Sequence, residues 1–190
     1  MSAAEGGALD RIARTLGAAL LVLLAGPAWS RCQDGLRAAT PTARFVVHPD
    51  GTATDRRTGL TWMRCPLGAT LDDGGTPELL DDDHCRPGSL EAPRSTWGAA
   101  LRAAAQLDAS GGFAGSTGWR VPSWKELLSI VETRCASPAI NLQVFPDTEG
   151  LYLTSTTYAP VKTTVWGLDF QAGMPITVGK TGLAQVRLVR

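Results

Sequence analysis

The chain has 190 residues, of which 44% are hydrophobic and 19% charged, so it can bury one core of ordinary size and is not a disordered polyelectrolyte. Its 18 basic side chains balance 18 acidic ones. We therefore expect no nucleic-acid partner and no general attraction to anionic membranes, because both need a net basic face.

Residues 1–30 have the features of a secretory signal peptide. Arg11 precedes an apolar run at 16–25, and the small residues Ala28 and Ser30 stand at the spacing that signal peptidase needs. The apolar run has about 10 residues, whereas a membrane span needs about 20. We predict cleavage after Ser30, export to the periplasm or the extracellular space, and no stable membrane span in the mature chain.

All four cysteines follow this segment, and an even number in an exported chain indicates two disulfides. Three pairings are open. We favour Cys65–Cys85, which would close a loop of about 20 residues that lacks apolar periodicity and would contribute roughly 3 kcal/mol. Cys32–Cys135 would then attach an irregular arm at residues 31–43 to the segment after a helix. A zinc site is disfavoured because no C-x-x-C spacing is present.

The middle of the chain predicts three short strands followed by two helices. The strands are expected at 45–47, 52–55 and 60–64, with a hairpin turn at Asp50-Gly51. The first helix should begin at Ser95 or Thr96 and end at Gly111-Gly112. The second should begin with the capping box that runs from Ser123 to Glu126 and extend no further than Pro138.

The last 40 residues return to a β pattern. Strands are expected at 151–156, 165–170, 176–178 and 184–189. Two helices within a series of strands, without alternation of strand and helix, predict an α+β fold with an antiparallel sheet.

Known catalytic signatures are missing, and we expect no catalytic residues, no cofactor and no resident metal. The two histidines, His48 and His84, are expected at solvent-exposed positions. Residues 72–83 contain a run of acidic side chains that could offer oxygen ligands to calcium, but the spacing of calcium-binding loops is absent. A solvated charged face is the ordinary explanation, and calcium binding is left open.

Trp62, Trp97 and Trp124 follow apolar patterns and are expected in the core. Tyr158 and Trp166 lie in the irregular carboxy-terminal part, where loops could display them to a sugar ring. The segment 160–190 has four basic residues, Lys162, Lys180, Arg187 and Arg190, against the single acidic Asp169. We therefore take Tyr158, Lys162, Trp166 and Lys180 as a candidate ligand surface.

A series of short motifs over residues 44–190 resembles the bacterial Lcl C-terminal domain family. They occur in the order of that family: Arg44-Phe45, Asp50-Gly51-Thr52, Thr58-Gly59-Leu60, Trp62, Arg64-Cys65, Trp97, Gly112-Phe113-Ala114-Gly115, Trp119-Arg120-Val121-Pro122, Lys125-Glu126-Leu127, Pro138-Ala139-Ile140-Asn141, Val144-Phe145-Pro146 and the terminal Val186-Arg187-Leu188-Val189-Arg190.

The resemblance implies a C-type-lectin-like fold with a twisted antiparallel sheet, two helices and long irregular loops. It also implies export and an adhesion-type role toward glycans, because the founding domain is associated with sulfated glycosaminoglycans. We expect an exported, non-catalytic, lectin-like module for a surface or extracellular glycan. The alternatives are a structural or protein-interaction subunit of a bacterial envelope or surface assembly, and an enzyme, either a glycan hydrolase or a relative of the formylglycine-generating fold that uses cysteine chemistry.

Overall fold

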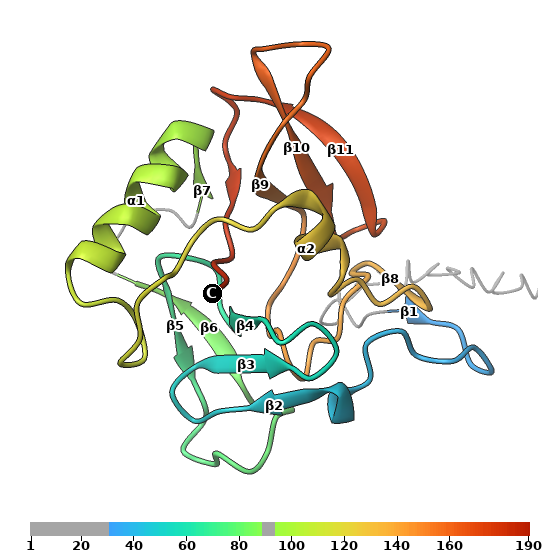
Figure 1. Ribbon diagram of the computed structural model, residues 1–190. Helices are drawn as coiled ribbons and strands as arrows, with labels where there is room; N and C mark the ends of the chain where they lie inside the picture. Colours follow the sequence, from blue (N-terminus) through green and yellow to red (C-terminus); the bar gives the residue numbers. More distant parts are fainter. Residues whose placement is uncertain (1–30, 89–93) are drawn as a thin grey trace, which may run out of the picture.

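The computed structural model describes residues 31–88 and 94–190 (Figure 1). The predicted signal peptide lies outside the described residues. The elements are, in chain order, β1 (Arg31–Cys32), η1 (Thr42–Arg44), β2 (Phe45–Val47), β3 (Thr52–Asp55), β4 (Thr61–Met63), β5 (Ala69–Asp72), β6 (His84–Pro87), β7 (Arg94–Ser95), α1 (Trp97–Ala109), α2 (Trp124–Leu128), β8 (Cys135–Ala136), β9 (Leu151–Thr157), β10 (Thr164–Asp169), β11 (Met174–Gly179) and β12 (Ala184–Gln185).

The fold is α+β, as predicted. The largest sheet has five strands in the order β11-β10-β9-β12-β7, and a second sheet has the order β2-β3-β4. Neighbouring strands run antiparallel except β12 and β9, which pair in parallel through Gln185 and Tyr152. In Figure 1, α1 and α2 lie on different sides of the large sheet, and β2 to β4 form a separate layer below it. Among the described residues, no helix has the length and hydropathy to cross a membrane.

The carboxy-terminal segment joins the two sheets. We expected one strand over 184–189, but only Ala184–Gln185 is regular. Beyond it, successive backbone groups pair with different segments: Leu67 donates to the Val186 carbonyl at 2.7 Å, and Met63 donates to the Leu188 carbonyl at 3.1 Å. The chain end therefore runs through the centre of the molecule, where Figure 1 marks the C-terminus.

Two clusters of buried side chains form the core. The first cluster includes Trp62, Leu127 of α2 and Tyr152 of β9. The second cluster includes Ala100 of α1 and Leu153 of β9. Trp62 is fully buried, as predicted. The prediction that Trp97 is a core residue holds in part, because Trp97 is half-buried but packs against the second cluster. The same prediction for Trp124 is wrong, because Trp124 is half-buried and belongs to neither cluster of the described residues. Each of these two tryptophans is the first residue of its helix.

The helices begin where the sequence predicts. Gly111 and Gly112 follow α1 with φ angles of 104° and 81°, a left-handed conformation that favours glycine and ends the helix. The capping box at Ser123 and Glu126 is present, but α2 ends at Leu128. The next turns are tighter, with bonds such as Val131 N–H to the Leu128 carbonyl at 3.2 Å. The second helix is therefore much shorter than the limit set by Pro138.

Both predicted disulfides are present, Cys32–Cys135 and Cys65–Cys85, with Cα–Cα distances of 3.9 and 5.5 Å. They use all four cysteines of the chain. The segment inside the Cys65–Cys85 loop is more regular than expected, because β5 and β6 pair there, with Leu71 opposite Cys85. The disulfide fixes this hairpin, which has no apolar alternation of its own.

Candidate functional site

Three aromatic side chains form a half-exposed cluster at one end of the large sheet. Trp166 projects from β10, Trp124 begins α2, and Tyr158 follows the end of β9. The Trp166 and Trp124 rings lie 5.9 Å apart between centroids and are tilted by 31°. Tyr158 meets Trp166 edge-on at 5.1 Å. We call Tyr158, Trp166 and Trp124 the aromatic cluster.

Backbone contacts between β9 and the start of α2 fix this cluster. Ser155 N–H donates to the Pro122 carbonyl at 2.7 Å, and Trp124 N–H donates to Thr156 Oγ1 at 3.2 Å. Trp124 is therefore held over the sheet by its own backbone as well as by ring packing. The position of the cluster follows from two rigid elements rather than from a flexible loop.

Glu126 fixes the start of α2 from the other side. Its carboxylate accepts Ser123 N–H at 2.7 Å and the two terminal nitrogens of Arg120 at 2.6 and 2.8 Å. The hydrogen bonds from Arg120 outweigh burial and lower the pKa of Glu126 to about 2. The same pairing raises the pKa of Arg120. Glu126 therefore stays ionised, which suits its place in the first turn of a helix.

The polar groups of the aromatic cluster are available to a ligand. Neither the indole N–H groups of Trp124 and Trp166 nor the Tyr158 hydroxyl makes a hydrogen bond to another described residue. The rings offer apolar faces, and these three groups offer donors and an acceptor at their rims. Such a combination fits a ligand that has both apolar faces and hydroxyl groups.

The structure places the four residues of the candidate ligand surface at one end of the sheet but does not bring all four together. Tyr158 and Trp166 lie together, and Lys162 is exposed in the loop that joins β9 to β10. Lys180 lies beside the same loop, since its N–H donates to the Thr163 carbonyl at 2.8 Å. Its ammonium group, however, lies 4.6 Å from the centroid of Trp97 at the start of α1. All four occupy one end of the sheet, but Lys180 packs with α1 while the aromatic cluster packs with α2.

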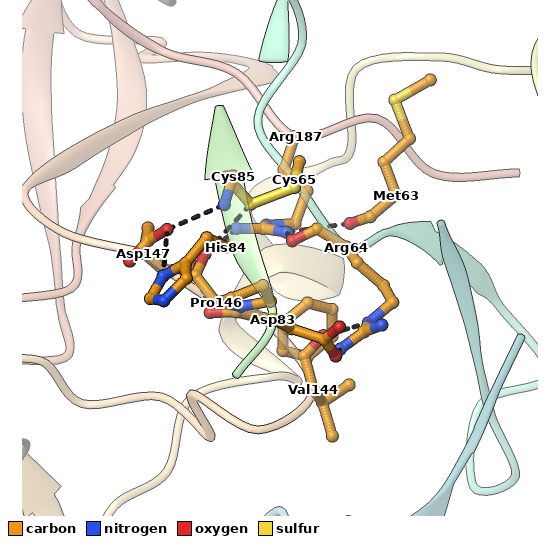
Figure 2. The surroundings of a disulfide bond; sticks show 12 residues. Met63, Arg64, Cys65, Asp83, His84, Cys85, Val144, Pro146, Asp147 and Arg187 are labelled. Carbon is orange, nitrogen blue, oxygen red and sulfur yellow. Dashed lines mark hydrogen bonds and ion pairs between the residues drawn. A yellow bond between two sulfur atoms is a disulfide. The ribbon is translucent and has the colours of Figure 1, made fainter. Parts of the chain in front are cut away.

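The basic carboxy-terminal surface is smaller than expected, because Arg187 is fully buried. Figure 2 shows its guanidinium beneath the Cys65–Cys85 disulfide, next to the backbone of Met63 and Arg64. It donates to the Met63 carbonyl at 2.9 Å and also to the Arg64 carbonyl. Burial lowers its pKa. Arg187 is therefore a core residue and does not contribute to a ligand surface.

The acidic run near the second disulfide is divided among separate partners. Asp83 is buried in an ion pair with Arg64, and Asp72 pairs with Arg86. His84 is exposed, as predicted, and lies 3.4 Å from Asp147, which also accepts Cys85 N–H (Figure 2). His48, in contrast, is half-buried and hydrogen-bonded to Thr54 at 3.0 Å. Within 31–88 and 94–190, no three His, Cys, Asp or Glu side chains converge as a metal site would require.

The family model of the Lcl C-terminal domain matches residues 51–190. This chain belongs to the Lcl C-terminal domain family. The resemblance seen in the sequence is thereby confirmed over most of its length. Residues 31–50, which include the arm and β2, lie outside the matched range of the Lcl C-terminal domain. A comparison with curated proteins gave no match.

The sequence indicated two of the three residues of the aromatic cluster. It indicated Tyr158 and Trp166 because both lie in the carboxy-terminal part, where loops were expected to display them. Tyr158 does follow a strand end, but Trp166 lies within β10 and not in a loop. It missed Trp124, whose place on the apolar side of a capping-box helix is typical of a core residue. The signal that could have found it is position: the first residue of a short helix has no preceding turn to cover it.

Proposed function

We propose that this chain is an exported, disulfide-stabilised binding module that recognises a surface or extracellular glycan without catalysis. The observation that carries this proposal is the aromatic cluster, which is half-exposed and held by rigid elements, and whose polar rims make no hydrogen bond to residues that the structure describes. The two disulfides support the export part of the proposal, because such bonds persist in oxidising compartments.

A saccharide ring suits this cluster for a physical reason. Its C–H faces are apolar and can stack on Trp166 or Trp124, while its hydroxyl groups can reach the indole N–H groups and the Tyr158 hydroxyl. Lys162 adds one exposed positive charge nearby. An anionic sugar would therefore bind more tightly than a neutral one, by a margin that falls with salt.

A role as a protein-interaction subunit of the bacterial envelope is the second candidate. β11 is an edge strand of the large sheet, with β10 as its neighbour on one side. Met174 is 59% exposed and Ile176 is 37% exposed on this strand. Exposed apolar side chains on an unpaired edge favour addition of a strand from a partner protein.

A glycan array tests the leading proposal. Three proteins are compared on it with both disulfides intact: the wild type, Trp166→Ala and Tyr158→Phe. The wild type should bind a defined set of glycans, and the affinity of Trp166→Ala for the same glycans should be lower by about tenfold or more. Tyr158→Phe keeps the ring and removes only the hydroxyl, so its affinity for the glycans should fall less than that of Trp166→Ala.

Leu79→Ala is the matched control, because Leu79 is 58% exposed and belongs to the acidic segment inside the Cys65–Cys85 loop. Its removal should leave glycan binding unchanged. Absence of binding to every glycan by folded wild-type protein would reject the proposal. Capture of one stoichiometric envelope protein that is insensitive to sugars, and lost on Ile176→Asp, would support the second candidate instead.

A further inference from the structure

A hollow of about 590 Å³ lies between the amino-terminal arm and the turn that joins β3 to β4. Its lining is strongly basic: Arg37, Ala38, Ala39, Pro41, Arg44, Arg56 and Arg57. None of these described lining residues is acidic. We call this the arginine hollow.

Most of its positive charge is not compensated. Arg44 forms an ion pair with Asp55. The Asp55 carboxylate is fully buried and forms no ion pair with the other three arginines of the hollow. Arg37, Arg56 and Arg57 are all exposed and form no ion pair with any carboxylate in the described ranges. Like charges that share one hollow repel each other, so an anion bound among them would be stabilised.

Hydrogen bonds fix the backbone of the turn that carries Arg56 and Arg57. Asp55 accepts Arg57 N–H at 2.9 Å and the Thr58 hydroxyl at 2.7 Å. Gly59, with a φ of 73°, closes the turn by donating to the Asp55 carbonyl at 2.8 Å. Burial alone raises the pKa of Asp55, but the hydrogen bonds from Arg44, Thr58 and Arg57 outweigh it and lower the pKa. The turn is therefore rigid before any ligand binds.

The arm that carries Arg37 is held just as firmly. Glu132 accepts Ala39 N–H at 3.0 Å and Thr40 N–H at 2.8 Å, and Arg44 donates to the Ala39 carbonyl at 3.2 Å. The Cys32–Cys135 disulfide attaches the other end of the arm. Arg37 thus stands between two fixed points.

We propose that the arginine hollow binds a phosphate monoester group, carried either by a phosphorylated sugar or by a lipid headgroup. Guanidinium groups match phosphate oxygens with paired, charge-assisted hydrogen bonds. A phosphate monoester carries about 1.5 to 2 negative charges at neutral pH, so it neutralises more of the charge of Arg37, Arg56 and Arg57 than a carboxylate does. Arg57 also donates a hydrogen bond of 3.5 Å to the Ser129 carbonyl, which leaves its charge uncompensated. The volume leaves room for the group to which the phosphate is attached.

This site is independent of the proposed glycan function. It shares no residue with the aromatic cluster. Arg37 and Arg44 precede Gly51, where the match to the Lcl C-terminal domain begins, whereas Arg56 and Arg57 lie within the matched residues. The hollow is therefore built from both sides of that boundary.

Isothermal titration of the oxidised protein with glucose 1-phosphate, and with glucose as the neutral control, tests the soluble source. Vesicles of phosphatidylcholine with phosphatidic acid, compared with phosphatidylcholine alone, test the lipid source. Binding in either phosphate arm supports the shared chemistry and identifies its source. Absence of binding in both arms by the folded protein would overturn the proposal.

Single changes of Arg56, Arg57 or Arg37 to alanine should each weaken phosphate binding by about tenfold, since each removes a charge-assisted contact. Arg102→Ala is the matched control, because Arg102 is an exposed arginine on α1 and should have no effect. Trp166→Ala should also leave phosphate binding intact. Equal losses on Arg102→Ala, or unchanged binding by the Arg56→Ala/Arg57→Ala double variant, would contradict the assignment.

Discussion

Arg187 Nη2 donates a hydrogen bond to Thr148 Oγ1 at 2.6 Å in the fully buried centre of the molecule. The Arg187 guanidinium carbon also lies 4.9 Å from the ring centroid of Phe145 and 5.5 Å from that of Tyr152. No carboxylate pairs with this arginine among the described residues. Backbone carbonyls, a hydroxyl and two aromatic rings replace water around the terminal nitrogens of the guanidinium, whereas its Nε has no hydrogen-bond partner among the described residues.

This arrangement predicts that the geometry of Arg187 matters as much as its charge. Arg187→Ala should lower the free energy of unfolding by about 3 kcal/mol or more, because it opens a cavity and leaves buried carbonyls without a donor. Arg187→Lys should rescue little, since one ammonium cannot reach both the Met63 carbonyl and Thr148. Urea unfolding checks both variants. A lysine variant as stable as wild type would show that charge alone suffices.

The two disulfides should differ in their contribution to stability. Cys32 and Cys135 are 103 residues apart in sequence, whereas Cys65 and Cys85 are 20 apart. On the chain-entropy account, replacement of both cysteines by alanine should lower the free energy of unfolding by about 5 kcal/mol for the first pair and about 3 kcal/mol for the second. Urea unfolding midpoints of the two double variants give the comparison. The opposite order would contradict the entropic explanation.

Glu126 should make stability depend on pH in the acidic range. Its pKa falls from 4.5 to about 2 on folding, so its contribution is fully present above pH 4.5 and is lost as the pH falls toward about 2. The stability difference between wild type and Glu126→Gln should therefore be constant near neutral pH and shrink through this window. Denaturant unfolding at several pH values measures it. A difference that grows on acidification would be inconsistent with an ionised Glu126.

The end of α1 offers a matched pair of glycines. A Cβ at Gly112 would lie 1.9 Å from the Ser116 carbonyl oxygen, whereas a Cβ at Gly111 meets nothing within 4 Å. Both have positive φ angles. Gly111→Ala should cost about 1 kcal/mol for backbone strain alone, and Gly112→Ala about 3 kcal/mol or more because of the additional clash. Thermal unfolding distinguishes them, and equal losses would mean that the loop after α1 relaxes freely.

Local signals predicted the elements that have local causes. The turn at Asp50-Gly51, the capping box of α2 and the glycines after α1 act within a few residues, so β2, β3 and both helix starts were found. The disulfide pairing also followed from the sequence, because an unpatterned segment between two cysteines needs a covalent closure.

Features that depend on partners remote in sequence were missed, because local signals carry no information about such partners. β5 and β6 have no apolar alternation and owe their pairing to the Cys65–Cys85 bond and to contacts such as Arg86 with Asp72. Arg187 looked like a surface cation because its partners at Met63 and Thr148 are remote in sequence. The arginine hollow joins residue 37 to residues 56 and 57, and only the folded arm brings them together.

The glycan proposal has its most direct test in the indole N–H signals of the protein. Five tryptophans are described, and each gives one such signal in a nitrogen-proton correlation spectrum: Trp62, Trp97, Trp119, Trp124 and Trp166. Titration with a glycan from the array should shift Trp124 and Trp166 strongly and leave the buried Trp62 and Trp119 unchanged. Binding that leaves Trp124 and Trp166 unshifted would contradict the placement of the ligand on the aromatic cluster.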